Sequence, residues 1–439
     1  MNKSVARPDD GVHSFFASAA QKIGEAVLDA PFIKSLRKLL APRHRERRFN
    51  LPTLIWLGIY GAANASLASM KAILDHACEA VEGKGNLPLH LRTLTESGWS
   101  RAKDRLPLRL VKRFWHHWVE LARLAAGTKA LYHGMRLVAL DKKTITVPEA
   151  LWTTFRAHRG SRGAGPAQAE LMVAYDVAAR VPLDLTLARV RQNERRMAPY
   201  LLHRLPAPSL LLIDCGFYGL PLFLDARAAG HHFLTKMAKS GSPKVLERFT
   251  WKDGLFLITD RRHGQTMVVR IITAQRRGFR SVRLVTSLLD PEAFPRKEII
   301  ELYHERWHIE TFFRELQEDL DFEHWHTRTL HGLWVELLFS MIYVTVVRAH
   351  MAESVARKPT LPGHLSFGAG ADACLRAWCR IPKCVPERVQ PIRRELIEEL
   401  GTLKIDIRPG RLFERNTQKR RAQSRAKKLQ ALKAKELAA

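Results

Sequence analysis

The sequence is short of acidic residues relative to basic ones. Its 439 residues include 43 Asp and Glu against 72 Lys and Arg, which gives a formal net charge of +29. The isoelectric point is near 10.4. An excess of this size favours a polyanionic partner, and nucleic acid is the commonest one. Charge alone does not distinguish DNA from RNA or from an anionic membrane surface.

Cysteine is also scarce, with five residues in the whole chain and no C-x2-C pair. Cys374, Cys379 and Cys384 are spaced by five residues, but no histidine pattern completes a metal cluster around them. The odd count and the unpaired spacing favour free or buried thiols in a reducing compartment.

Long uncharged apolar runs are missing as well. No stretch of about 18 apolar residues lacks charge, so the sequence predicts no transmembrane helix. The first residues, MNKSVARPDDGVHSFF, lack the apolar segment of a signal peptide. We therefore expect a cytoplasmic protein that, in a bacterium, contacts the nucleoid. The length allows two or three structural units and a large core.

The chain does contain one unusual helix-forming stretch, residues 301–317, without Gly or Pro. At 100° per residue, one arc of this helix is polar and aromatic and a second arc, centred roughly 120° away, is apolar. The first arc holds Tyr303, Arg306, Trp307, Glu310, Arg314 and Gln317, and the second holds Leu302, Ile309, Phe312, Phe313, Leu316 and Leu320. A carboxylate between two arginines suits an acid that holds a metal ion next to a phosphodiester. The alternative is an amphipathic helix with incidental surface charges.

The spacing Tyr303-x2-Arg306-x3-Glu310 resembles the Tyr-x2-Arg-x3-Glu-x6-Lys signature of the insertion-sequence-four family of DDE transposases. Gln317 stands where that signature has Lys. The resemblance implies an RNase H-like catalytic fold, two further acids that are aspartates on strands, and a DNA-bound homodimer. It also implies Mg²⁺ as the cofactor, with Mn²⁺ able to substitute.

Asp141 and Asp214 lie in the expected context, because each follows a short apolar run that predicts a strand. The run that ends in Leu-Ile-Asp214-Cys-Gly-Phe-Tyr resembles the second-aspartate motif of the family, although Arg is commoner than Cys after the aspartate. The match at Asp141 is looser, because Lys142 and Lys143 precede Thr144 where the family usually has Asp-Gly-Thr or Asp-Gly-Ser. Alone, an aspartate at a strand end is more often a turn former or cap.

The predicted fold class is α/β, an RNase H-like catalytic fold with a mostly β insertion, an all-helical N-terminal domain and a helical C-terminal region. The predicted boundaries are 1–130 for the helical DNA-binding region, 131–238 for the first part of the catalytic core, 239–296 for the β-rich insertion, 297–355 for the second part with the Glu310 helix, 356–407 for the C-terminal helices and 408–439 for a basic tail. That tail carries 11 Lys and Arg against two Glu, which is typical of an arm that is disordered or ordered by DNA.

Within the helical N-terminal region, Ser100 could cap a helix that carries Arg101, Lys103 and Arg105. A basic helix of this kind can follow a DNA backbone and contribute salt-dependent affinity. The alternative is a solubilising face.

Together with these features, the family resemblance implies an insertion-sequence transposase that binds terminal inverted repeats, cleaves DNA and joins the freed 3′-OH ends to target DNA. Asp141, Asp214 and Glu310 would hold two metal ions, because two-metal phosphoryl transfer needs converging carboxylates. The remaining predicted DNA contacts are Tyr303, Arg306 and Gln317 to phosphates, Trp307 to a displaced base, and Arg314, which could replace the missing cation at Gln317.

Two other functions remain open from the sequence. One is a nuclease of the same fold that hydrolyses DNA without strand transfer. The other is a catalytically inactive DNA-binding protein derived from a transposase, against which the three intact acids argue.

Overall fold

The computed structural model describes residues 30–40, 51–82, 95–127, 131–156, 159–160, 163–238, 243–260, 264–275, 281–356, 364–380 and 389–405. The described residues up to Leu403 belong to one compact unit, and Lys404 begins a second one. The basic tail predicted at 408–439 and Cys384 lie outside the described residues.

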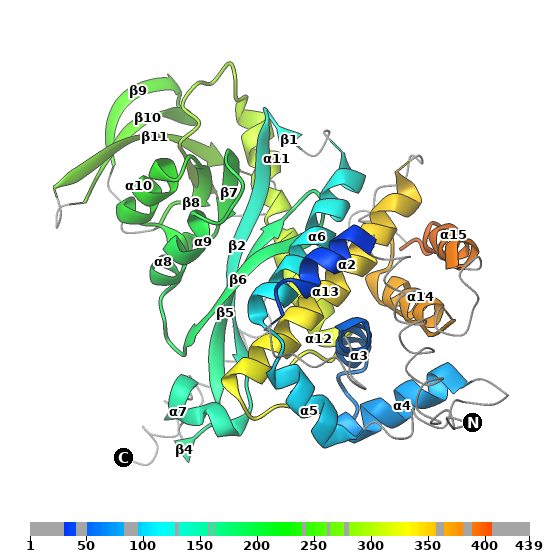
Figure 1. Cartoon of the computed structure of the whole chain (residues 1–439). Coiled ribbons are helices and arrows are strands. Elements are labelled where there is room, and N and C mark those ends of the chain that lie inside the picture. Colours follow the sequence, from blue (N-terminus) through cyan, green and yellow to red (C-terminus); the bar gives the residue numbers. More distant parts are fainter. Residues whose placement is uncertain are drawn as a thin grey trace, which may run out of the picture. The chain divides into compact units, whose positions relative to one another are not determined.

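A ten-stranded mixed sheet runs through the larger unit (Figure 1). Its strand order is β6-β5-β2-β7-β8-β12-β11-β10-β9, with β1 paired to the start of β2. The strands are β1 (Leu131–Tyr132), β2 (Met135–Thr146), β5 (Gln168–Asp176), β6 (Val181–Arg189), β7 (Ser209–Ile213), β8 (His232–Lys236), β9 (Lys244–Thr250), β10 (Asp253–Asp260), β11 (Gln265–Ala274) and β12 (Val282–Thr286). A separate two-stranded sheet joins β3 (Arg159–Gly160) and β4 (Gly163–Ala164).

Strand direction in this sheet changes at β2. β6, β5 and β2 are antiparallel neighbours, whereas β2, β7 and β8 are parallel neighbours. Parallel strands need crossover connections, and short helices precede the second and third of them. These are α8 (Glu194–Met197) and α9 (Pro199–Leu202) before β7, and α10 (Leu220–Ala228) between β7 and β8.

The segment predicted as a β-rich insertion, 239–296, does contain strands β9 to β12. These strands continue the central sheet, because β12 pairs antiparallel with β8 at Thr286 and Leu234. The β10–β11 hairpin forms as predicted, with Asp260 opposite Gln265, although its turn residues 261–263 lie outside the described residues.

Helices cover both faces of the long strands. Figure 1 shows α8, α9 and α10 on one side of β2, β5 and β6, and α6 (Leu108–Ala126), α12 (Trp307–Glu318) and α13 (Leu330–Val355) on the other. α13 is long and apolar enough to cross a membrane by composition, yet 78% of its most apolar window is buried inside the protein. It packs on α6 and on α3 (Leu51–Ala63), so it serves as a core helix.

The helices predicted before residue 125 are present in the described part of the chain. They include α2 (Ala30–Arg37), α4 (Met70–Glu82) and α5 (Glu96–Asp104). The prediction that Ser100 caps a helix is wrong, because Thr95 is the cap of α5. Its hydroxyl accepts a hydrogen bond from the Gly98 N–H at 3.1 Å.

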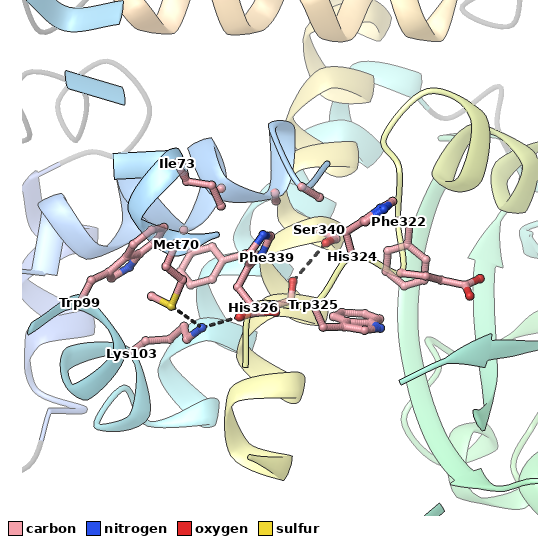
Figure 2. A pocket seen from close by; sticks show the side chains of 16 residues that line it. Met70, Ile73, Trp99, Lys103, Phe322, His324, Trp325, His326, Phe339 and Ser340 are labelled. Carbon is pink, nitrogen blue, oxygen red and sulfur yellow. Dashed lines mark hydrogen bonds and ion pairs between the residues drawn. The ribbon is translucent and has the colours of Figure 1, made fainter. Parts of the chain in front are cut away.

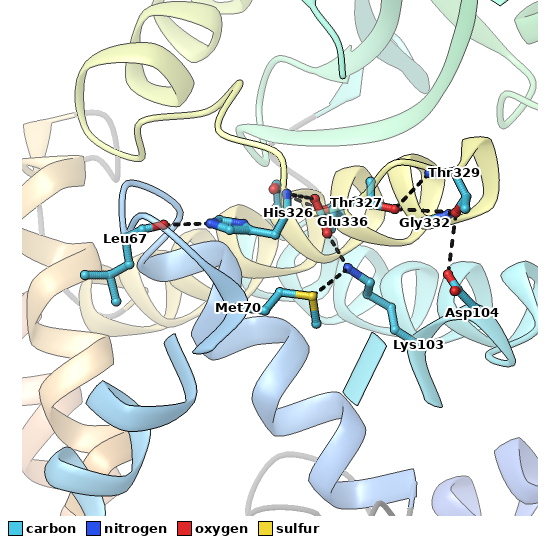
Figure 3. A network of polar contacts seen from close by, with 10 residues as sticks. Leu67, Met70, Lys103, Asp104, His326, Thr327, Thr329, Gly332 and Glu336 are labelled. Carbon is cyan, nitrogen blue, oxygen red and sulfur yellow. Dashed lines mark hydrogen bonds and ion pairs between the residues drawn. The ribbon is translucent and has the colours of Figure 1, made fainter. Parts of the chain in front are cut away.

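A buried polar network joins α5 to α13 (Figure 3). The Lys103 ammonium on α5 pairs with one carboxylate oxygen of Glu336 on α13. The other oxygen accepts from the His326 N–H at 2.9 Å, and the His326 ring donates to the Leu67 carbonyl at 2.7 Å. The adjoining cavity of about 40 Å³, with Trp99 and Phe339 in its wall (Figure 2), has room for a few water molecules only.

The stretch predicted as one helix, 301–317, is two helices. Arg306 lies between α11 (Arg296–Glu305) and α12 (Trp307–Glu318). It forms a turn while keeping helical dihedral angles (φ −51°, ψ −31°). The apolar arc is buried as predicted at Ile309, Phe312, Phe313, Leu316 and Leu320. Arg306, however, is buried rather than placed on an open face, with 7% of its surface exposed.

The remaining elements are η2 (Glu149–Leu151), α7 (Trp152–Phe155), η3 (Cys215–Phe217), α14 (Phe367–Arg380) and α15 (Val389–Leu400). α14 and α15 pack on each other and on α13. The four described cysteines are free thiols, as the sequence predicts: Cys78, Cys215, Cys374 and Cys379.

Candidate active site

The register of two parallel strands brings Asp141 and Asp214 together. Leu140 of β2 lies opposite Ile213 of β7, so the next residue along each strand is one of the two aspartates. Neighbouring strands are about 4.8 Å apart, which makes their backbones adjacent. The sequence placed Asp141 at a strand end, but β2 continues to Thr146 and keeps pairing with β5 beyond it.

Backbone hydrogen bonds orient both aspartates. Asp214 caps η3 by accepting from the Cys215 N–H at 2.6 Å, and its own carbonyl accepts from the Thr235 hydroxyl at 3.1 Å. One Asp141 oxygen accepts from the Lys142 N–H at 2.8 Å. Each side chain therefore has one oxygen held by the backbone beside it.

Glu310 approaches from α12, which packs on β2. The Arg306 guanidinium lies between Glu310 and Asp141. Its Nη2 donates to Glu310 Oε1 at 2.8 Å, and its Nη1 lies 3.7 Å from Asp141 Oδ2. Arg306 therefore connects the acid on the helix to the acid on the strand.

Asp141 lies in an environment that disfavours its charged form. Burial is the largest cause that raises the pKa of Asp141 to about 6, and the negative charges of Glu310 and Asp214 act in the same direction. The Lys142 N–H and the Arg306 cation act in the opposite direction. A carboxylate whose ionised form is disfavoured by burial and by like charges is typical of functional sites.

The donor set fits a divalent metal ion, since all three side chains offer carboxylate oxygens, which Mg²⁺ prefers. In this conformation, no three His, Cys, Asp or Glu side chains of the described chain are grouped closely enough to share an ion. Arg306 lies between Asp141 and Glu310 and supplies the positive charge there.

Tyr303 and Trp307 both lie near Arg306. Burial raises the pKa of the Tyr303 hydroxyl to about 12, and the charges that act on it include Arg306 and Asp214. Tyr303 is therefore a neutral hydroxyl at the edge of the site. Trp307 is 41% exposed, and the Arg306 guanidinium lies 5.5 Å from the centre of its ring.

Comparison with known proteins identifies the class to which this arrangement belongs. The family model described as "Transposase DDE domain" matches residues 132–345, a span that includes all three acids. The transposase InsG of insertion sequence element IS4 from Escherichia coli (strain K12) is 22% identical over 396 residues, which cover 86% of this chain and 87% of that protein. The chain belongs to the DDE transposases of the insertion-sequence-four type.

The transposase is thus an enzyme of a class that generally uses divalent metal ions. Among solved structures, it is similar to the piggyBac transposase in a synaptic complex with hairpin DNA. That alignment covers 93% of this transposase and 87% of the other chain, with 8% identity and a TM-score of 0.40.

The cation beside Gln317 in the transposase is Lys143, a residue that the sequence interpretation missed. The Lys143 ammonium donates to Gln317 Oε1, and Gln317 Nε2 donates to Glu323 Oε1 at 3.1 Å. Arg314, the compensating cation predicted from the helix, instead lies 3.8 Å from Glu318 and is more than half exposed. Lys143 follows Asp141 by two positions on a strand, so both side chains leave β2 on the same face.

We expect Lys143→Gln to weaken binding to all DNA sequences and to reduce the slope of log affinity against log salt by about one unit, because one phosphate contact is lost. Gln317→Lys in that background should restore the slope, since it returns one ammonium to the same place. Fluorescence anisotropy over a salt series measures this. An unchanged slope in Lys143→Gln would show that the cation does not contact phosphate.

Proposed function

We propose that this transposase binds the terminal inverted repeats of its insertion sequence, cleaves DNA there by metal-assisted hydrolysis and joins the freed 3′-OH to target DNA by transesterification. The observation that carries the proposal is the placement of Asp141 and Asp214 next to each other on β2 and β7, with Glu310 facing them from α12. Three carboxylates supplied by neighbouring elements are the kind of donor set that two-metal phosphoryl transfer uses.

We also propose that the catalytic fold is RNase H-like, formed by residues 131–238 and 297–355 around an insertion at 239–296. Support comes from the strand order β6-β5-β2-β7-β8, in which the first three strands are antiparallel neighbours and β7 and β8 are parallel to β2. Numbered along the chain, this order is third, second, first, fourth, fifth. The proposed flanking regions are 1–130, 356–407 and 408–439.

In this proposal Asp141, Asp214 and Glu310 hold two Mg²⁺ ions, for which Mn²⁺ can substitute. When bound, such a pair activates the attacking oxygen and stabilises the leaving oxygen. The backbone hydrogen bonds at Cys215 and Lys142 keep one oxygen of each aspartate fixed, so that reorganisation on binding is small.

The proposed DNA contacts surround these acids. Tyr303, Arg306, Arg314 and Gln317, together with Lys143, would contact backbone phosphates, and the half-exposed Trp307 ring would stack on a displaced base. The net charge of +29 supports a DNA partner. A homodimer on DNA, acting at the nucleoid in the cytoplasm, completes the proposal.

The test is a cleavage assay with Mg²⁺ and a duplex that carries the terminal repeat, followed by detection of joined products. Cleaved ends that become covalently attached to target DNA support the proposal. Cleavage without joining would indicate a nuclease, and binding without cleavage would indicate an inactive DNA-binding protein.

Removal of residues 408–439 should lower affinity for every DNA sequence and reduce the salt slope by several units. The 11 cations of this segment can contact phosphates without reading bases. A salt titration with matched specific and random duplexes measures the effect. Equal slopes for the full and shortened chains would show that the segment does not contact DNA.

A further inference from the structure

The Arg306 guanidinium places a positive charge between Asp141 and Glu310, where a bound metal ion would also place one. Its guanidinium contacts Glu310 at 2.8 Å and lies 3.7 Å from Asp141. The Arg306 side chain is 8% exposed, whereas those of Asp141 and Glu310 are 23% and 35% exposed. The guanidinium is therefore largely shielded from water, which strengthens its ion pairs relative to fully exposed ones.

The pairing of Arg306 is also incomplete. Its Nε atom is buried and finds no hydrogen-bond acceptor among the residues that the structure describes. A buried donor without a partner is unfavourable, because it has lost its hydrogen bonds to water. A ligand that accepts from Nε and one Nη together would relieve that cost, and a phosphate group has the geometry for such a two-point contact.

A divalent ion and the guanidinium compete for the same oxygens of Asp141 and Glu310. Both are cations, and neither can approach these carboxylates closely while the other is there. Arg306 lies at the junction of α11 and α12, one helical turn before Glu310, so metal binding to both acids requires its side chain to turn away.

Resting on the function proposed above, we propose that Arg306 holds Asp141 and Glu310 in the metal-free transposase and releases them when a DNA phosphate takes its guanidinium. Binding of DNA and binding of metal are thereby coupled. Coupling is reciprocal, so DNA raises the metal affinity by the same factor as metal raises the DNA affinity. In protein that has no DNA bound, Arg306 therefore blocks the metal site.

The experiment is a calorimetric titration of Mn²⁺ into the full-length protein without DNA. Arg306→Gln should bind Mn²⁺ about tenfold more tightly than wild type, because the competing cation is gone. The same variant should bind a duplex carrying the terminal repeat more weakly in metal-free buffer. A change in opposite directions distinguishes this role from a purely structural one, which would weaken both.

Two further variants keep the test decisive. Arg376→Gln removes the same charge at an exposed position on α14, outside the proposed site, and should leave Mn²⁺ affinity unchanged. Arg306→Lys retains a cation and should keep Mn²⁺ affinity near that of wild type, even if Arg306→Gln folds poorly. Unchanged or weaker Mn²⁺ binding by Arg306→Gln, or tenfold tighter binding by Arg306→Lys, would overturn the proposal.

The controls Asp141→Asn and Glu310→Gln separate this inference from the proposed function. Both should lose Mn²⁺ binding if these acids are the ligands. If they do so while Arg306→Gln shows no gain, only the role of Arg306 fails. If they bind Mn²⁺ as wild type does, the assigned metal ligands are wrong.

Discussion

Asp141→Asn, Asp214→Asn and Glu310→Gln are each expected to lower the rate of DNA cleavage and joining by at least about a thousandfold. The metal ions that these carboxylates would hold contribute several kcal/mol of transition-state stabilisation. Each 1.4 kcal/mol corresponds to a factor of ten in rate, so loss of about 4 kcal/mol gives the expected decrease.

The structure gives each substitution a specific consequence. Asn at position 214 can still cap η3 through its side-chain oxygen, and Asn at position 141 can still accept from the Lys142 N–H. The backbone geometry is therefore retained while the negative charge is lost. In metal-free buffer the variants should still bind DNA, because phosphate contacts depend on cations rather than on these acids.

The measurement is single-turnover cleavage with Mg²⁺, with electrophoretic detection of cut and joined strands. Thermal unfolding serves as the control for folding. Asp141→Asn should be at least as stable as wild type at neutral pH, because burial raises the pKa of Asp141 to about 6 and so already disfavours its charged form. A variant that cleaves at near wild-type rate would remove its residue from the proposed ligand set.

Lys103→Met is expected to destabilise the fold by about 3–5 kcal/mol, the typical cost of removing one partner of a buried ion pair. The Lys103 and Glu336 side chains are 7% and 17% exposed, so water compensates only in part for the lost charge. The remaining carboxylate also accepts from the His326 N–H, which keeps it inside the network.

Chemical denaturation of the variants measures the free energy of unfolding. The double variant Lys103→Met with Glu336→Gln should recover most of the loss, since Gln keeps an acceptor for His326 and carries no charge. Lys71→Met is the matched control on α4, where the exposed pair with Asp75 should contribute less than about 1 kcal/mol. Equal effects of Lys103→Met and Lys71→Met would contradict the importance of the buried pair.

Sequence patterns predicted the parts of the site whose structure depends on a short segment of the chain. The apolar runs before Asp141 and Asp214 predicted strands, and the structure forms β2 and β7 there. The apolar arc of 301–317 predicted a buried helical stripe, which is confirmed at Ile309 and Phe313. These signals depend on periodicity and burial within a short segment.

The features that the sequence did not predict depend on contacts between distant segments. The burial of Arg306 follows from its position between Glu310 and a strand more than 160 residues earlier. The pairing of Lys143 with Gln317 likewise joins β2 to α12. Helical periodicity placed Arg306 and Gln317 on one face but could not show which cation reaches that face from the sheet.

The central position of α13 has a consequence for synthesis of the chain. α3 and α6 are made early, but the helix on which they pack follows roughly 200 residues later. At about 5–20 residues per second, the ribosome needs roughly 10–40 s to cover that distance. During this interval the nascent chain presents the apolar surfaces of α3 and α6 to the solvent, including Trp115, which contacts Thr345 of α13 in the folded protein. Holdase chaperones are therefore expected to bind nascent chains that stop before α13 and to release chains that include it.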